Sequence, residues 1–212
     1  RITGPGFAMT VADTVKDPTG ILIHKGRVEK GQVRTGDTVH LAVDEAARRA
    51  TAGNHTATHI LHAALREILG DHVKQAGSLV APDRLRFDFT HFSQVDPETL
   101  DRIEARVNEH IQENVPVEIV EMAAEEAFKT GAMALFEEKY GDRVRVISLD
   151  TFSKELCGGT HARLTGDIGC FKIISESSIA SGVRRIEATS GRSAVDRKST
   201  RLNSSPRIRP RM

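Results

Sequence analysis

Residues 44–70 read DEAARRATAGNHTATHILHAALREILG, and from residue 60 onward the large apolar side chains recur every three or four positions. This spacing predicts an amphipathic helix over 44–69, with Gly70 at its C-terminal cap. His55 and His59 are four residues apart in this run, so a helix would carry both imidazoles on one face, one above the other. Two histidines in that arrangement form half of a metal site.

The other half of a metal site is found in the Cys-Gly-Gly-Thr-His motif at 157–161. Its glycines let the backbone turn tightly between a thiol and an imidazole. Together with the helical pair, these side chains make a nitrogen and sulfur donor set that suits zinc. We therefore predict a Zn2+ site formed by His55, His59, Cys157 and His161. No glutamate lies between the helical histidines, so a peptidase of the thermolysin type is disfavoured.

The remaining histidines have no comparable neighbours, and we interpret them as structural or solvent-exposed: His24, His40, His62, His72, His91 and His110. The only other cysteine is Cys170. A disulfide between Cys157 and Cys170 is conceivable, but it would consume the thiol that the zinc site needs. Two cysteines are also far fewer than a secreted disulfide scaffold uses.

Composition narrows the class of protein. The chain has 212 residues, of which 39% are hydrophobic, enough to form a core. It contains no apolar run long enough to span a bilayer and no signal-peptide pattern, so we expect a cytoplasmic protein without membrane contact. Lys and Arg total 30 against 29 Asp and Glu. Any contact with nucleic acid must therefore come from a local patch.

Three regions are expected along the chain. Residues 1–46 contain short β-like runs punctuated by Gly26, Gly31 and Gly36, which predicts hairpins of a small, partial β-barrel. Residues 47–191 mix helical and strand patterns, which predicts an α+β domain with a mostly antiparallel sheet. Beyond the first helix, we expect strands at 85–90, 117–120, 143–149, 168–175 and 183–188, a helix starting at Asp96-Pro97, and a short helix ending at Gly131.

Residues 192–212 are basic and poor in large apolar side chains. They cannot form a core element by composition. A basic RNA-binding tail is one interpretation of this segment. We favour disordered or non-native sequence, because a short basic block without interleaved aromatics is weak evidence for recognition.

Five motifs in order resemble the editing region of the alanyl-tRNA synthetase family: NHTATH at 54–59, QAGS at 75–78, DRLRFDF at 83–89, ELCGGTH at 155–161 and GVRRIEA at 182–188. The metal motifs are similar to those of free-standing alanyl-tRNA editing proteins and of the related threonyl-tRNA synthetase domain. Residues 1–46 resemble the barrel that precedes the editing domain in full-length synthetases. The resemblance implies a fragment without the aminoacylation domain, unable to activate alanine with ATP, and without the C-terminal tRNA-holding domain. Glu137 departs from the family pattern, where a small residue is expected.

The resemblance implies hydrolytic editing of mischarged Ser-tRNA-Ala and Gly-tRNA-Ala. A pocket built for alanine excludes one extra hydroxyl or one missing methyl by only about 1–3 kcal/mol, so a second, hydrolytic site is needed. That site can spare alanine by hydrogen-bonding the serine hydroxyl, because alanine would leave those polar groups unpaired. We consider Thr58, Gln75 and Thr160 for this contact. The same argument does not explain the removal of glycine.

Further roles follow from the resemblance and from general chemistry. Zinc would either activate a water or hold the substrate amino group while a separate water attacks, and four protein ligands favour the second role. Gln75 is a candidate for orienting the water or the substrate carbonyl. Backbone N–H groups of Gly158 and Gly159 are candidates for stabilising the oxyanion.

The expected RNA partner is the acceptor end of tRNA-Ala, with Arg84, Arg86, Arg184 and Arg185 as candidate contacts. Ordinary salt bridges are an equally good interpretation of these arginines, and strand alternation would put Arg184 and Arg185 on opposite faces. The alternative for the whole chain is a non-catalytic, zinc-stabilised module that binds tRNA or a protein. Turnover distinguishes the two, since a binding module would release no amino acid.

Overall fold

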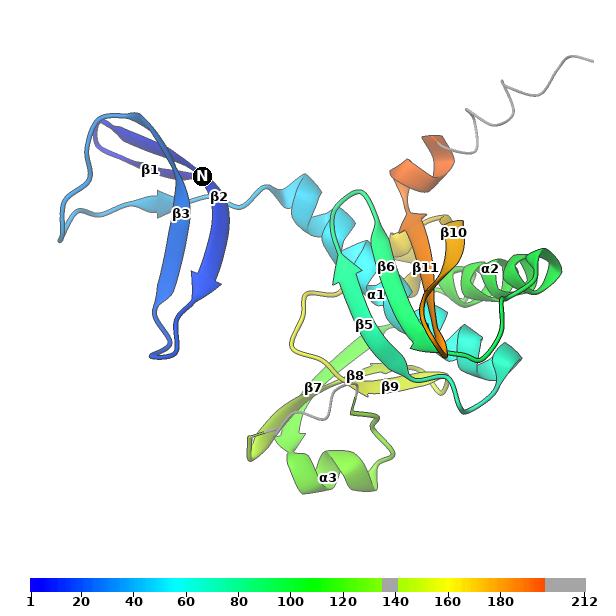
Figure 1. The fold of residues 1–212 in the computed structure, drawn as a ribbon. Coiled ribbons are helices and arrows are strands. Elements are labelled where there is room, and N and C mark those ends of the chain that lie inside the picture. The colour runs from blue at the N-terminus through cyan, green and yellow to red at the C-terminus, as the bar shows by residue number, and fades with distance from the viewer. Residues whose placement is uncertain (135–140, 197–212) are drawn as a thin grey trace, which may run out of the picture. The chain divides into compact units, whose positions relative to one another are not determined.

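The computed structural model describes residues 1–134 and 141–196 (Figure 1). It divides into two compact units, Arg1–Arg48 and Arg49–Met212. Glu137 lies outside the described residues. Within the described part of the chain, no helix is long and apolar enough to cross a membrane.

The first unit is one antiparallel sheet of four strands in the order β3-β2-β1-β4. The strands are β1 (Ile2–Gly4), β2 (Phe7–Lys16), β3 (Leu22–Lys30) and β4 (His40–Leu41). All of residues 1–48 are described, and β3 and β4 remain unpaired edges of the sheet. The predicted barrel is therefore corrected to an open sheet. It does not close because residues 31–39 form no strand and β4 has only two residues.

Gly26 corrects the predicted strand boundaries. It lies inside β3 and does not separate two hairpins. The actual turn follows Asp17, whose Oδ1 accepts hydrogen bonds from the backbone N–H groups of Thr19 and Ile21, each at 2.9 Å. A Cβ at Gly26 would collide with the Thr10 carbonyl on β2, so a glycine here permits close strand approach.

The second unit is built around α1 (Glu45–Leu69), the helix predicted from the opening stretch. Its buried face, which includes Ile60, Leu61 and Leu65, packs in one core with Phe87 and Ile186. The sheet that supplies these partners has the order β10-β11-β6-β5 and is entirely antiparallel. Its strands are β5 (Gln75–Val80), β6 (Leu85–Thr90), β10 (Phe171–Ala180) and β11 (Val183–Ser190).

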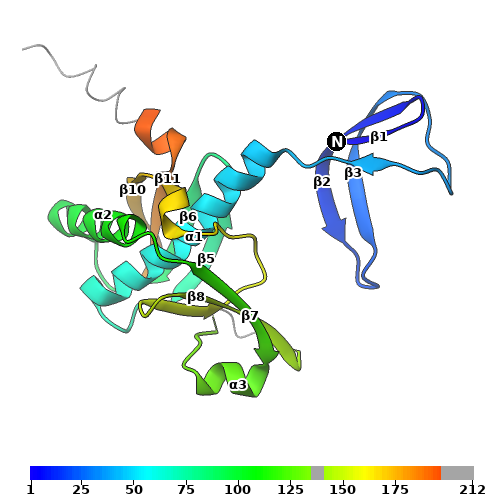
Figure 2. The same cartoon turned by 180° about the vertical axis from the view of Figure 1, so that it is seen from behind.

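A second helix, α2 (Pro97–Gln112), packs into the same core, so that α1 and α2 cover one face of this sheet (Figure 2). It begins where Asp96 and Pro97 predict. The Asp96 side chain caps the helix by accepting a hydrogen bond from the backbone N–H of Thr99 at 2.9 Å.

A smaller antiparallel sheet of order β7-β8-β9 leads into the second metal motif. It consists of β7 (Val117–Ala123), β8 (Arg143–Leu149) and β9 (Ser153–Leu156), and α3 (Ala124–Lys129) packs beside it on a core of Ala127, Val144, Val146 and Leu156. Because β9 ends at Leu156, the Cys157 loop begins directly at the edge of this sheet. The loop then leads to the short 3-10 helix η1 (Thr165–Ile168).

The α+β class is confirmed, and the described residues of the second unit form two antiparallel sheets where one was expected. The strand expected at 168–175 starts at Phe171 and runs to Ala180, because Ile168 belongs to η1 and Gly169 turns the chain with a φ of 75°. At the start of the segment expected to lie outside the fold, residues 192–196 are helical and Ala194 is 1% exposed. The rest of that segment lies outside the described residues.

Candidate metal centre

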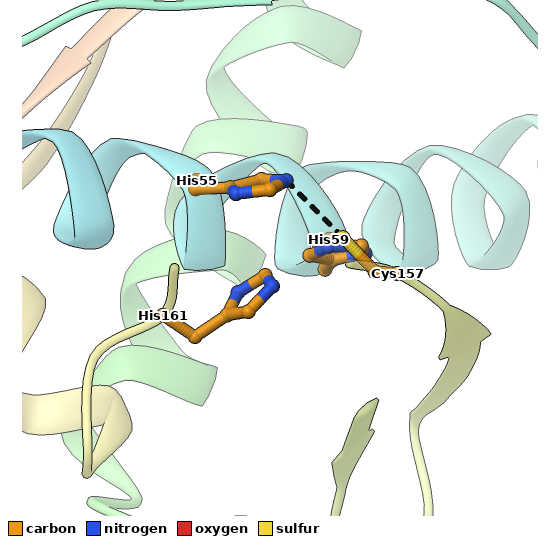
Figure 3. A group of neighbouring side chains, drawn as sticks. All are labelled: His55, His59, Cys157 and His161. Atoms are coloured by element: carbon orange, nitrogen blue, oxygen red, sulfur yellow. Dashed lines mark hydrogen bonds between the residues drawn. The ribbon is translucent and has the colours of Figure 1, made fainter. Parts of the chain in front are cut away.

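α1 and the loop after β9 bring the four predicted zinc ligands together (Figure 3). The ligand atoms of His55, His59, Cys157 and His161 all lie within 4.8 Å of one another. Cys157 Sγ is 3.4 Å from His55 Nε2, and the ring centroids of His55 and His161 are 4.3 Å apart. Helical periodicity places the first two side chains, and the loop presents the other two to them.

The loop is held against α1 by close packing and by an arginine. A Cβ on Gly159 would collide with the His55 ring, so only a glycine leaves room for that imidazole. From β8, the Arg145 guanidinium donates hydrogen bonds to the carbonyl of Cys157 at 3.1 Å and to that of Gly159. The backbone N–H of Cys157 in turn donates to the Arg145 carbonyl at 3.0 Å. Arg145 is not among the residues predicted from the sequence.

A buried carboxylate lies behind the cluster. Glu155 is 1% exposed, and its two oxygens lie 2.5 Å from His59 Nδ1 and 2.9 Å from His62 Nδ1. Sequence reasoning missed Glu155 and treated His62 as merely structural or exposed. One available signal was strand alternation, which puts Glu155 on the same side as Cys157, two residues later.

A buried hydroxyl takes a similar place beside His161. Thr56 Oγ1 is 3.3 Å from His161 Nδ1 and accepts a hydrogen bond from the backbone N–H of Ala162 at 3.0 Å. Thr56 is fully buried on α1, so it links the helix to the end of the loop.

The charges in the cluster are strongly coupled. Burial disfavours a charged Cys157, but the neighbouring imidazoles of His161, His55 and His59 lower the pKa of its thiol to about 3. Burial also opposes charge on His59, yet the Glu155 charge raises the pKa of that imidazole to about 10. Burial raises the pKa of Glu155, but the charges and hydrogen bonds of His59 and His62 together lower it to about 2. Burial lowers the pKa of His161. A thiolate is therefore favoured at Cys157.

These residues fit a divalent metal ion. His59 Nε2 and His161 Nε2 both belong to side chains of the cluster. Both atoms are buried and have no hydrogen-bond partner among the described residues. Buried polar atoms are rarely left unpaired, and these nitrogens beside a thiolate are placed to bind a metal ion. Three imidazoles and one thiolate are a donor set that zinc accepts.

The other predicted site residues differ in exposure and in whether their side chains already form hydrogen bonds. Thr58 is buried, and its hydroxyl donates to the Asn54 carbonyl within α1 at 2.8 Å. Gln75 is half-buried on β5, and its Nε2 donates to Ser78 Oγ at 3.3 Å. In the loop, Gly158 and Thr160 are exposed, and a Cβ on Gly158 would meet nothing within 4 Å.

The four candidate RNA-binding arginines all form ion pairs. Arg184 binds Glu176 through two hydrogen bonds of 2.6 and 2.7 Å, and Arg185 binds Asp88 through two of 2.6 and 2.8 Å. Arg86 and Arg84 pair more loosely, each at 3.6 Å from a carboxylate, with Arg84 having 53% of its side chain exposed. Arg184 lies opposite Phe89 and Arg185 opposite Asp88 on β6, so strand alternation separates the two as expected.

Most of the histidines outside the cluster have partners of their own. His24 contacts Thr14 at 2.9 Å, and His72 contacts His91 at 2.8 Å. His110 stacks on Phe152 with 3.9 Å between ring centroids. His40 forms part of β4. Only His62 joins the surroundings of the metal cluster, through Glu155.

Comparison with known proteins agrees with the motif order. The family described as "Threonyl and Alanyl tRNA synthetase second additional domain" matches residues 144–187. The chain is 66% identical to an alanine–tRNA ligase of Desulfosudis oleivorans over 194 residues, which are 92% of this chain and 22% of that protein. It is 61% identical to the alanine–tRNA ligase of Halorhodospira halophila over 195 residues, again 92% and 22%.

A third alanine–tRNA ligase, from Thermotoga maritima, is 58% identical over 177 residues, or 84% of this chain and 20% of that protein. The chain thus spans about a fifth of the length of the curated relatives it matches. Identity at this level over most of the chain leaves no doubt about common ancestry. The chain belongs to the alanyl-tRNA synthetase family.

Proposed function

We propose that the second unit hydrolyses the ester bond of mischarged tRNA-Ala, removing serine and also glycine. The observation that carries the proposal is the cluster of His55, His59, Cys157 and His161, in which two buried nitrogens have no hydrogen-bond partner among the described residues. The alanine–tRNA ligase relatives support tRNA as the partner. We propose its acceptor end as the part recognised and the cytoplasm as the location.

In this proposal the four ligands hold Zn2+, which supplies positive charge at the reaction site. Water adds to the ester carbonyl carbon, the bond to the ribose oxygen breaks, and that oxygen takes up a proton. The products are the free amino acid and tRNA. Gln75 orients the water or the carbonyl, and backbone N–H groups of Gly158 and Gly159 stabilise negative charge on the carbonyl oxygen.

Selection against alanine would use polar groups near the metal. The Thr58 hydroxyl donates to Asn54, so it can still accept a hydrogen bond from the hydroxyl of a seryl group. Gln75 and Thr160 are the other candidates for this contact. Alanine lacks the hydroxyl and would leave these groups unpaired, which disfavours its ester.

We propose that the four arginines bind the RNA backbone and that they contribute unequally to tRNA affinity. Arg84 and Arg86 hold their carboxylates only at 3.6 Å, and the exposed Arg84 can exchange its partner for a phosphate at low cost. Arg184 and Arg185 would have to break two short hydrogen bonds each. We therefore expect the first pair to contribute more to tRNA affinity than the second.

One feature favours a second candidate, a non-catalytic zinc-stabilised module. Four protein ligands normally close the coordination sphere of a structural zinc. The exposed Gly158 beside the cluster favours catalysis instead, because an open backbone next to the metal leaves room for substrate.

The test is to incubate the purified, metal-quantified protein with Ser-tRNA-Ala and, separately, Ala-tRNA-Ala, and to follow loss of each ester. Rapid loss of the seryl ester alone would support editing. Cys157→Ala should abolish the reaction. Full activity in a metal-stripped Cys157→Ala protein would refute the role of zinc, and binding of tRNA without release of any amino acid would favour the module.

A further inference from the structure

Two buried side chains contact ligand rings at the nitrogen that does not face the other ligands. Glu155 contacts Nδ1 of His59, and Thr56 contacts Nδ1 of His161. We propose that Glu155 and Thr56 are positioning residues, which fix the orientation and proton placement of these imidazoles so that Nε2 of each is directed at the metal. The inference rests on the proposed zinc site and extends it beyond the four ligands.

Glu155 fixes His59 because a carboxylate can only accept hydrogen bonds. With Oε2 at 2.5 Å from His59 Nδ1, that nitrogen must be the donor. A neutral His59 then carries its lone pair on Nε2, the buried atom for which the described residues offer no partner. The other carboxylate oxygen accepts from His62 Nδ1 at 2.9 Å and from Ser153 Oγ at 3.3 Å, so the group is held on both sides.

Thr56 fixes His161 by a different chemistry. Its oxygen accepts the backbone N–H of Ala162 and has a second lone pair, which accepts from Nδ1 of His161 in the tautomer that leaves Nε2 free for a metal. Donation from Nδ1 again leaves the lone pair of the ring on Nε2, which is buried without a partner among the described residues. Thr56 lies between His55 and His59 in sequence, so α1 orients a ligand that the loop supplies.

The effect on metal binding follows from coordination chemistry. A metal takes the lone pair of one ring nitrogen, and a hydrogen bond at the other nitrogen fixes the tautomer and raises the basicity of the ligand. Removing such an outer partner typically weakens metal affinity by about 10–100-fold. Glu155 and Thr56 are themselves buried, so water cannot readily replace either side chain.

The test measures Zn2+ affinity of the full chain without tRNA, by competition with a chromophoric chelator, together with the absorption spectrum of the Co2+-substituted protein. Glu155→Gln keeps the size of the side chain but removes its charge and one acceptor. It should weaken Zn2+ binding by about 10–100-fold and shift the Co2+ bands. Ser153→Ala, which removes the weakest contact to the same carboxylate, is the matched control and should bind Zn2+ as the unmodified chain does.

A second pair of variants tests the contact to His161. It also provides an independent test of the inference if Glu155→Gln does not fold. Thr56→Val removes the hydroxyl next to His161 with little change in volume. Thr58→Val makes the same change on the same helix, at a hydroxyl bonded to the Asn54 carbonyl. We expect weaker Zn2+ binding and altered Co2+ bands for Thr56→Val only.

Wild-type affinity and an unchanged Co2+ spectrum in Glu155→Gln and Thr56→Val would overturn the inference and leave the proposed zinc site standing. Equal losses in Thr56→Val and Thr58→Val would also overturn it, because they would indicate a general effect on α1. If the unmodified chain binds no Zn2+, the proposed zinc site fails and this inference fails with it.

Discussion

Replacing Gly159 by alanine should remove His55 from the metal cluster. A Cβ on Gly159 would overlap Cε1 and Nδ1 of the His55 ring and would still lie 3.3 Å from Nε2, the farthest of the three contacted atoms. Carbon contacts normally lie at about 3.5–4.0 Å, so the ring must move by about 1 Å or more. A metal–ligand distance tolerates only about 0.2 Å.

We expect Gly159→Ala to lose Zn2+ affinity by at least about 100-fold. Removing a residue that only hydrogen-bonds a metal ligand costs up to about 100-fold, and here a ligand itself is displaced. Competition with a chromophoric chelator measures it. Gly158→Ala is the matched control, since a Cβ there meets nothing within 4 Å, and it should leave the affinity unchanged. Wild-type Zn2+ binding by Gly159→Ala would refute this account of how the loop packs on α1.

Three further predictions concern stability, each measured by urea unfolding. In metal-free protein, the raised pKa of His59 contributes stability below pH 6.5, and this contribution is lost as the pH rises toward 10. The lowered pKa of Glu155 contributes stability above pH 4.5, and this contribution is lost as the pH falls toward 2. The lowered pKa of the Cys157 thiol adds stability above pH 9 that is lost as the pH falls toward 3. Stability should therefore peak between about pH 6.5 and 9, and a flat profile from about pH 3 to 10 would contradict these buried groups. Phe87→Ala should cost about 3–5 kcal/mol, because Phe87 is fully buried between α1 and the sheet; a loss below about 1 kcal/mol would place it outside the core. Asp96→Ala should cost about 1 kcal/mol through loss of the α2 cap, and no loss would mean that the Thr99 contact is absent in solution.

Features encoded by local periodicity were predictable from the sequence. The 3.6-residue repeat predicts α1, and it also places His55 and His59 on one face. Asp96 and Pro97 mark the start of α2 because capping depends on neighbouring residues alone. The order of the motifs was enough to suggest the family, which the relatives then confirmed.

Features that depend on contacts distant in sequence were not predictable in this way. The pairing of Glu155 with His59 and His62 requires β9 to lie against α1, and no local pattern specifies that packing. Arg145 acts through the carbonyls of another segment, so its sequence neighbours give no signal. The open first sheet follows from strands that fail to pair, whereas glycine spacing suggested a barrel. The roles of Gln75, Thr58 and Thr160 stay predictions.

The position of the cluster also has a consequence for folding. His55 and His59 belong to α1, whereas Cys157 and His161 follow β9, and the chain between them includes β5 to β9. A metal ion bound by all four would close this long segment into a ring, much as a covalent cross-link does, and would restrict the unfolded chain more than the folded one. Metal binding and folding of the second unit would then be one equilibrium, and a strong chelator would act on it as a denaturant.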